Sequence, residues 1–226
     1  MSHVILVRPG CTEFDEQQRI QGTLDLPLSA QGDEQVQRTI SELSQVSLDL
    51  ICTSPCEPAR SCAERIGAAL AVPVKELDGL QNLNQGLWQG LHIDDIRRKH
   101  PRVFKQWQES PETVCPPEGE MLWDVVCRVK KALEKPLRKN SHVAIIVPEP
   151  LASVVRCVVR NCPVEAIALF NAPADGRTWE YLTLNGSTPA DGRFACVAEH
   201  RTPQAAGAVS IAVPNGDVAD EYRRKN

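Results

Sequence analysis

The 226-residue sequence contains no long apolar run, no internal repeat and no excess of basic residues. Without about 18 consecutive apolar residues, a membrane-spanning helix is not expected. The formal net charge of −4 leaves no basic stripe that would neutralise phosphates along a duplex, so we expect no nucleic-acid partner. The opening MSHVILVRPG lacks the features of a secretory signal, and we therefore expect a cytoplasmic protein with reduced thiols.

Metal-ligand spacing is also missing. The chain has nine cysteines and five histidines, but no CxxC pair occurs. The histidines also do not lie at the sequence spacings from the cysteines that are typical of metal sites. We expect no metal and no cofactor, and we interpret the cysteines as a group as small buried hydrophobic residues.

What the sequence does contain is the composition of an ordinary globular protein, with 42% hydrophobic and 24% charged residues. The length suits one substantial domain with an appended piece. From residue 187 the composition shifts to Ala, Gly, Pro, Thr and Asp without a sustained period. We therefore predict an α/β domain over residues 1–186 and a loosely ordered tail over 187–226.

Short apolar runs alternate with amphipathic helical patterns, which favours a three-layer α/β/α sandwich around a mostly parallel sheet. The predicted strands are His3–Val7, Leu48–Cys52, Val72–Leu77, His142–Val147, Ala166–Phe170 and Trp179–Leu184, with a further short strand at Val209–Val213. The predicted helices are one opened by Ser29 that fills the thirties and early forties, Ala59–Leu70, 92–110 interrupted at Pro101, one starting at Leu122, and Leu151–Val159. Pro136 is expected to end or kink the helix that starts at Leu122.

The stretch VILVRPGCTEFDEQQRIQG at residues 4–22 closely resembles the opening motif of the histidine phosphatase superfamily, which includes the cofactor-dependent phosphoglycerate mutases. That family usually reads LVRHGxTxxNxxxRxQG there. Further similar blocks are DLPLSAQG at 25–32, TSPCEPARSCAE at 53–64, LQNLNQGLWQG at 80–90, residues 117–129 and residues 143–156. The resemblance implies a phosphoglycerate mutase-like fold and phosphoryl transfer through a phosphohistidine.

The groups that carry this chemistry in the family are replaced. Pro9 stands where the family has its nucleophilic histidine, and Pro148 stands where a second histidine contacts the transferred phosphoryl group. Pro58 replaces a phosphate-binding arginine, and Asn82 replaces the glutamate that acts as general acid. A proline ring cannot attack phosphorus and has no backbone N–H, while an amide cannot protonate a leaving group.

Other positions match the family's pattern, which implies that the fold is retained. The matching residues are Gly10, Thr12, Arg19, Gln21, Gly22, Pro27, Gly32, Ser54, Pro55, Gly86, Gly90, Gly119 and Glu120, in addition to Arg8. The residues expected to line any remaining site at the strand ends are Arg8, Asp15, Arg19 and Glu120. For Arg8, an internal ion pair with Glu120 or Glu149 is as good an interpretation as ligand binding.

The leading functional hypothesis is therefore a catalytically inactive family member, a pseudoenzyme, that acts by binding. Its ligand is unknown: a small anion held weakly by Arg8, or a protein partner. The first alternative is a phosphatase or phosphomutase that uses Cys11, activated by Arg8, as substitute nucleophile. In that reading Arg60 is no substitute for the lost arginine, because two residues along a helix turn the side chain by about 200°. The second alternative is a thiol redox or metal role of Cys11 and Cys56, with Cys62 as a third member.

Overall fold

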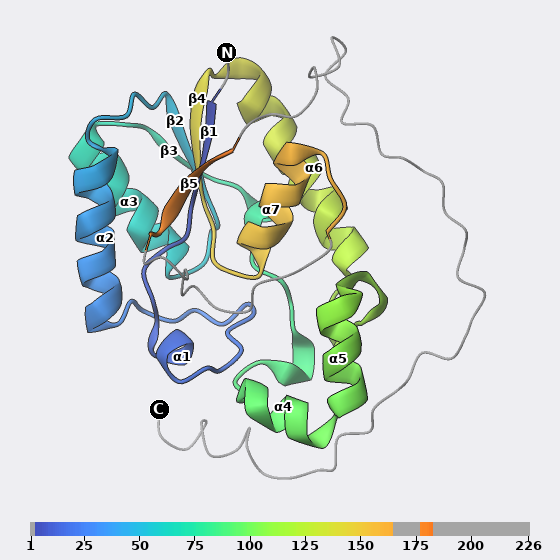
Figure 1. The fold of residues 1–226 in the computed structure, drawn as a ribbon. Helices are drawn as coiled ribbons and strands as arrows, with labels where there is room; N and C mark the ends of the chain where they lie inside the picture. The colour runs from blue at the N-terminus through green and yellow to red at the C-terminus, as the bar shows by residue number, and fades with distance from the viewer. Residues whose placement is uncertain (1–2, 165–176, 183–226) are drawn as a thin grey trace. The chain divides into compact units, whose positions relative to one another are not determined.

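A computed structural model of the chain describes residues 3–164 and 177–182 (Figure 1). The predicted boundary at residue 186, the tail 187–226 and the predicted strands Ala166–Phe170 and Val209–Val213 lie outside the described residues, so these expectations stay predictions. The described elements alternate between strands and helices, and they form the α/β architecture that the sequence pattern predicts.

In the described part of the chain, five strands form one sheet in the order β3-β2-β4-β1-β5. Their bounds are β1 His3–Val7, β2 Leu50–Thr53, β3 Val74–Glu76, β4 His142–Ile146 and β5 Trp179–Leu182. The first four run parallel to one another, and β5 pairs antiparallel with β1. Because parallel strands end on the same side, the carboxyl ends of β1, β2 and β4 share one edge of the sheet.

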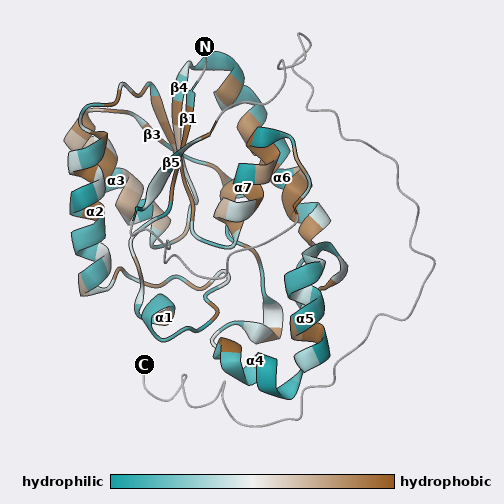
Figure 2. Ribbon diagram, viewed as in Figure 1, coloured by the Kyte–Doolittle hydropathy of each residue, from teal (hydrophilic) through white to brown (hydrophobic). Residues whose placement is uncertain are grey.

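Both faces of the sheet are covered by helices, because successive strand residues point to opposite sides. In β1, Val4 and Leu6 pack in one apolar cluster with residues of α6 and α7, whereas Ile5 and Val7 pack in another with residues of α2 and α3. In Figure 2 the helices carry both teal and brown stretches, as amphipathic helices do. The predicted three-layer sandwich with a mostly parallel sheet is confirmed.

The helices begin and end largely where the sequence predicts. Their bounds are α1 Glu13–Glu16, α2 Ala30–Leu43, α3 Ala59–Leu70, α4 Ile93–Lys99, α5 Pro101–Glu109, α6 Leu122–Lys139 and α7 Leu151–Arg160. Ser29 is the N-cap of α2 and accepts a hydrogen bond from the Gly32 N–H. Pro101 starts a new helix after α4, where a missing N–H costs nothing.

Two expectations about elements need correction. Helix α6 does not end at Pro136 but continues to Lys139. Pro136 lies in the last turn of the helix, and both it and Leu137 are buried, so core packing outweighs the one lost backbone bond. The second and third strands are β2 Leu50–Thr53 and β3 Val74–Glu76, which are shifted or shorter than the apolar runs at 48–52 and 72–77.

Candidate functional site

The carboxyl edge of the sheet is the place where the retained and the replaced family positions meet. Arg8 follows β1, Ser54 follows β2 and Val147 follows β4. The Val147 N–H donates to the Val7 carbonyl at 3.1 Å, and the Ser54 N–H donates to the Ile146 carbonyl at 3.3 Å. These bonds extend the ladder by one residue and hold the three strand ends side by side, so the segments that follow begin next to one another.

Three prolines are buried at this edge. Pro9 follows Arg8, Pro148 follows Val147, and Pro58 is the N-cap residue of α3. Pro150 has the same N-cap place before α7. A proline at a helix start removes an N–H that has no helical partner, so α3 and α7 tolerate Pro58 and Pro150. All four proline rings consist of saturated carbon and supply neither a nucleophile nor a proton.

The four histidines in the described part of the chain have other places in the fold. His3 and His142 stack at the amino ends of β1 and β4, on the opposite edge, with ring centroids 5.5 Å apart. The Nδ1 atom of His92 lies 3.0 Å from the Gln17 carbonyl, and His100 is the residue between α4 and α5. The fifth histidine, His200, lies outside the described residues.

Glu149 brings a carboxylate to this edge. The residue is only 3% exposed, and its Oε2 accepts hydrogen bonds from the backbone N–H and the hydroxyl of Ser153, at 2.9 and 2.8 Å. Its Oε1 lies 3.9 Å from the Arg8 guanidinium, so of the two internal carboxylates expected for Arg8, the structure pairs it with Glu149. Arg8 also donates to the carbonyl of Arg177 at 3.0 Å.

Burial raises the pKa of Glu149, although Ser153, Arg156 and Arg8 each act to lower it. The two guanidinium groups lie 3.9 Å away and keep 16% and 24% of their side chains exposed, so water screens them, while the carboxylate itself is fully buried. Desolvation therefore outweighs the two ion pairs.

Glu57 repeats the arrangement at the start of α3. The sequences EPARS at 57–61 and EPLAS at 149–153 place a Glu-Pro pair before each helix and a serine four residues after the glutamate. The Glu57 carboxylate accepts from the backbone N–H of Ser61 at 3.2 Å and from its hydroxyl. Helix N-termini attract anions through free N–H groups and the helix dipole. Here each of the two helices has an internal carboxylate in that position, a repeat that sequence reasoning missed.

Arg60 takes part in this internal pairing. Its guanidinium donates twice to Glu57 Oε1, at 3.0 and 2.8 Å, and about half of the side chain is exposed. The arginine is thus held at the start of α3 by the glutamate three residues before it. That Arg60 does not replace the family's arginine at position 58 stays a prediction.

Asn82 joins several backbone segments at this edge through hydrogen bonds. It is 2% exposed, and its amide nitrogen donates to the carbonyls of Gly22 and Glu149 at 3.0 and 3.1 Å. Its amide oxygen accepts from the N–H groups of Leu83 at 2.9 Å and Leu151 at 3.4 Å. The residue at the general-acid position therefore ties three segments of backbone together.

Glu120 is engaged away from Arg8. Its carboxylate accepts two hydrogen bonds from Arg128, at 2.7 and 3.2 Å, and one from the Asn84 N–H at 2.8 Å. Arg128 also donates to the carbonyls of Gly79, Gln81 and Asn82. The Arg128–Glu120 pair thus holds the segment that carries Asn82. The comparison with the family motifs did not identify Arg128 as part of this site.

Arg156 and Glu180 are also part of the charged network at this edge, and the sequence did not indicate them. Arg156 donates to Glu180 Oε1 at 2.9 and 2.7 Å, and its Nη2 lies 3.9 Å from Glu149. Arg160 lies 3.5 Å from the same Glu180 carboxylate. A chain of ion pairs therefore runs from Arg8 through Glu149 to β5, a strand that only the tertiary fold brings beside α7 and β1.

Asp15 and Arg19 make local contacts around α1. The Asp15 carboxylate accepts from the N–H and the hydroxyl of Thr12, which closes a capping box. Arg19 donates to the Gly90 carbonyl at 2.9 Å, and its guanidinium lies 5.9 Å from the centre of the Phe14 ring. Both side chains order the loop that follows β1.

The candidate thiols have different surroundings. Cys11 is 5% exposed, its N–H donates to Gln35, and burial raises the pKa of its thiol. Cys56 is half-buried near Ser54 and Gln81, and burial raises its pKa too. Burial raises the pKa of Cys62 to about 12. Thiols of this kind are poorly ionised near neutral pH.

The described cysteines are not uniformly buried, which corrects the expectation for the group. Cys11, Cys52 and Cys62 are buried, whereas Cys115 and Cys162 are exposed. The other three described cysteines are intermediate, namely Cys56, Cys127 and Cys157.

Within residues 3–164 and 177–182, no group of three or more His, Cys, Asp or Glu side chains is arranged to hold a metal ion. Over the same ranges, no helix has the length and apolar character needed to cross a membrane.

Comparison with known proteins agrees with the motifs. The chain is 33% identical over 147 residues to Phosphoserine phosphatase 1 of Hydrogenobacter thermophilus, covering 65% of this chain and 70% of that protein. It is 28% identical over 182 residues to Probable phosphoglycerate mutase GpmB of Escherichia coli, covering 74% and 85%. The structure of a mycobacterial glucosyl-3-phosphoglycerate phosphatase with VO3 superposes with a TM-score of 0.70 at 22% identity, covering 81% and 93%, which shows the shared fold.

The sequence model of the histidine phosphatase superfamily (branch 1) matches residues 4–179, which include β1 to β4 and every replaced position at the sheet edge. The parallel sheet, its two helical layers and the loop after β1 are those that the motifs imply. This chain belongs to the histidine phosphatase superfamily, branch 1.

Proposed function

We propose that this chain is a catalytically inactive member of its superfamily, one that acts by binding and not by phosphoryl transfer. The observation that carries the proposal is Pro9 at the carboxyl end of β1, the position that matches the family's nucleophilic histidine. A phosphohistidine needs an imidazole nitrogen that attacks phosphorus. Pro148 at the end of β4 and Asn82 remove the second histidine and the general acid in the same way.

The charged groups at this edge indicate that any affinity for phosphate is low. Glu57 and Glu149 place carboxyl groups at the starts of α3 and α7, and Arg8 is paired with Glu149. A phosphate dianion that approaches Arg8 meets a carboxylate 3.9 Å from the guanidinium. The Glu149 carboxyl group therefore competes with the dianion for the guanidinium, and repels the dianion when it is ionised.

For the ligand we retain a small anion held weakly by Arg8, or a protein partner that recognises the strand-end edge. Asp15, Arg19 and Glu120 are held by hydrogen bonds of 2.9 Å or shorter, whereas Arg8 lies 3.9 Å from Glu149 and donates to the Arg177 carbonyl at 3.0 Å, so we place the ligand contact at Arg8. We also propose a cytoplasmic location, on the composition of the sequence alone.

Phosphatase action by substitute groups is the second candidate, and the names of the relatives favour it. Cys11 is its nucleophile, with Arg8 as phosphate ligand. The burial of Cys11 and its raised pKa oppose this route, because a nucleophile has to be an accessible thiolate. A redox or metal role of Cys11 and Cys56 has no support in their surroundings.

Hydrolysis of p-nitrophenyl phosphate by the purified chain, from acidic to alkaline pH, tests the proposal. Arg8→Ala is the control for contaminating phosphatase, because contaminant activity does not depend on this residue. We expect no turnover that differs between the two proteins. Turnover lost in Arg8→Ala would overturn the proposal, and its additional loss in Cys11→Ser would establish the second candidate.

A further inference from the structure

The carboxyl end of α7 is closed by a Schellman motif. Asn161 adopts the left-handed conformation, with φ 51° and ψ 48°. The N–H of Cys162 donates to the carbonyl of Cys157 at 3.0 Å, and the N–H of Asn161 donates to the carbonyl of Val158 at 3.2 Å. This pair of bonds reverses the chain, so that the residue after the turn comes back against the last turn of the helix.

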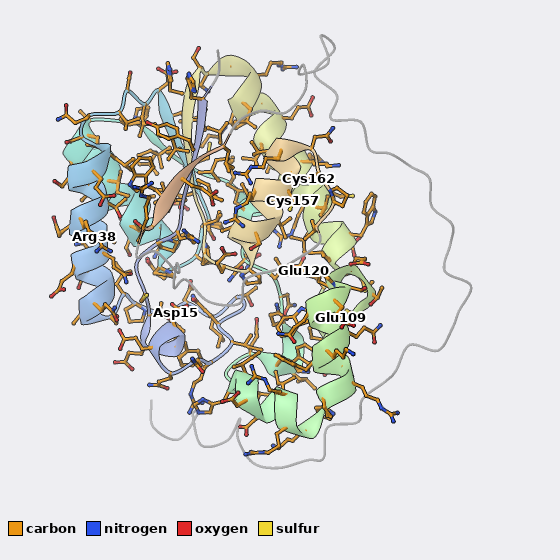
Figure 3. All side chains as sticks on the ribbon, in the orientation of Figure 1. Asp15, Arg38, Glu109, Glu120, Cys157 and Cys162 are labelled. Atoms are coloured by element: carbon orange, nitrogen blue, oxygen red, sulfur yellow. The ribbon has the colours of Figure 1, made fainter. Side chains whose placement is uncertain are left out.

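The reversal brings two sulfur atoms together. A Schellman motif usually places an apolar pair at the two positions joined by the longer bond, and here both positions are cysteines. The Cys162 side chain lies near enough to Cys157 to raise the pKa of its thiol. Figure 3 labels the two residues beside one another at the end of α7. Cys162 is exposed and Cys157 is half-buried, so a reagent reaches the first more easily.

Backbone geometry thus pre-arranges a thiol pair that neither the family motifs nor the proposed function uses. We propose that Cys157 and Cys162 form an oxidation site, at which a low-molecular-weight disulfide such as oxidised glutathione converts the two thiols into an intrachain disulfide.

The reaction consists of two thiol–disulfide exchanges. Cys162 loses its proton to solvent, and its thiolate attacks one sulfur of glutathione disulfide. A mixed disulfide forms, and one glutathione thiolate leaves and takes up a proton. Cys157 then loses its proton and attacks the Cys162 sulfur, which releases the second glutathione. The protein gives up two electrons and two thiol hydrogens, and glutathione disulfide is reduced to two glutathione molecules.

The second exchange is expected to accelerate as pH rises. Burial and the neighbouring Cys162 raise the pKa of Cys157 to about 11, while Arg156 and Arg160 act to lower it. Both arginines also pair with Glu180 of β5, which weakens their effect on the thiol. Because thiolate is the attacking species, the raised pKa of Cys157 slows closure of the disulfide near neutral pH.

Peptide mapping of the full-length chain tests the proposal directly. Reduced protein is incubated with oxidised glutathione, the free thiols are blocked with iodoacetamide, and the protein is digested with trypsin. Cleavage after Arg156, Arg160 and Arg177 separates the pair into peptides 157–160 and 161–177. We expect a disulfide to join these two peptides and dithiothreitol to reduce it. We also expect this disulfide to form faster at higher pH.

Three variants serve as controls. Cys157→Ser should stop the reaction at a glutathione adduct on Cys162, and Cys162→Ser, a change at an exposed position, should abolish the linked peptides. Cys115→Ser, which removes the other exposed described thiol, should leave them unchanged. A stable glutathione adduct on Cys162 of the unmodified chain would overturn the proposal. A disulfide from Cys157 or Cys162 to another cysteine, such as Cys127, would do so as well.

Discussion

Replacement of Asn82 by alanine should destabilise the fold, because it removes hydrogen bonds to four backbone groups. The amide is buried and joins the carbonyls of Gly22 and Glu149 to the N–H groups of Leu83 and Leu151. Alanine leaves all four backbone groups without this partner. Asn82 therefore connects three backbone segments at the sheet edge.

The size of the effect follows from these contacts. The bonds to Gly22, Glu149 and Leu83 are 3.1 Å or shorter, whereas the bond from Leu151 is 3.4 Å and adds little. At about 1 kcal/mol for each good bond, the loss is about 3 kcal/mol. For a chain of this size such a loss lowers the melting temperature by roughly 6–12 °C.

The assay is urea denaturation followed by circular dichroism and tryptophan fluorescence. Asn84→Ala is the matched control, because Asn84 lies two residues along the same segment, is less buried and makes a bond to Gly86 of 2.9 Å and a weak one to Glu118 of 3.4 Å. We expect a loss of about 1 kcal/mol for that variant. Equal losses for the two variants would refute the role of Asn82 as a connector.

Three further predictions concern the same framework. Gly32→Ala should cost about 1–3 kcal/mol or more in urea denaturation, because its Cβ would lie 2.1 Å from the Cys11 carbonyl oxygen; an unchanged midpoint would contradict the close approach. The pKa of Glu149 is raised in the folded state, so wild-type stability relative to Glu149→Gln should be highest below about pH 4.3 and fall as pH rises through the folded-state pKa. A pH-independent difference between those two proteins would show that burial does not control this carboxyl. Arg128→Met should cost about 2–4 kcal/mol, and a double-mutant cycle with Glu120→Gln should show coupling; strictly additive losses would argue against the pair.

Much of the fold could be predicted from local patterns. The bounds of β1, α2 and α3 follow from short-range features, namely apolar runs, the Ser29 cap and helical periodicity. Of the two outcomes expected at Pro136, an end or a kink, the structure excludes the end, because the burial of Pro136 and Leu137 outweighs one lost hydrogen bond. Packing decides such cases, and packing depends on the partner surface.

Some features of the candidate site could also be predicted from the sequence, and others could not. That prolines stand at positions 9, 58 and 148, and an asparagine at 82, is a covalent fact that comparison with the family motifs reads directly. The end of α7 had a weaker local signal, since Asn161 is a residue type that accepts the left-handed conformation and lies between Cys157 and Cys162 in the sequence. The repeat EPxxS before α3 and α7 was also present in the sequence, but its meaning depends on knowing that both helices begin at one edge.

The sequence by itself determined the family, the layered α/β fold and which residues stand at the motif positions, because motifs and periodicity are carried by residues close together in the chain. Only the tertiary structure decided which partners the remaining charges take. Arg8 pairs with Glu149, 141 positions away along the chain, and Arg156 joins Glu149 to Glu180 on the antiparallel strand. Ion pairs and shared hydrogen bonds act over a few ångströms, so they are set by which segments the folded sheet brings together.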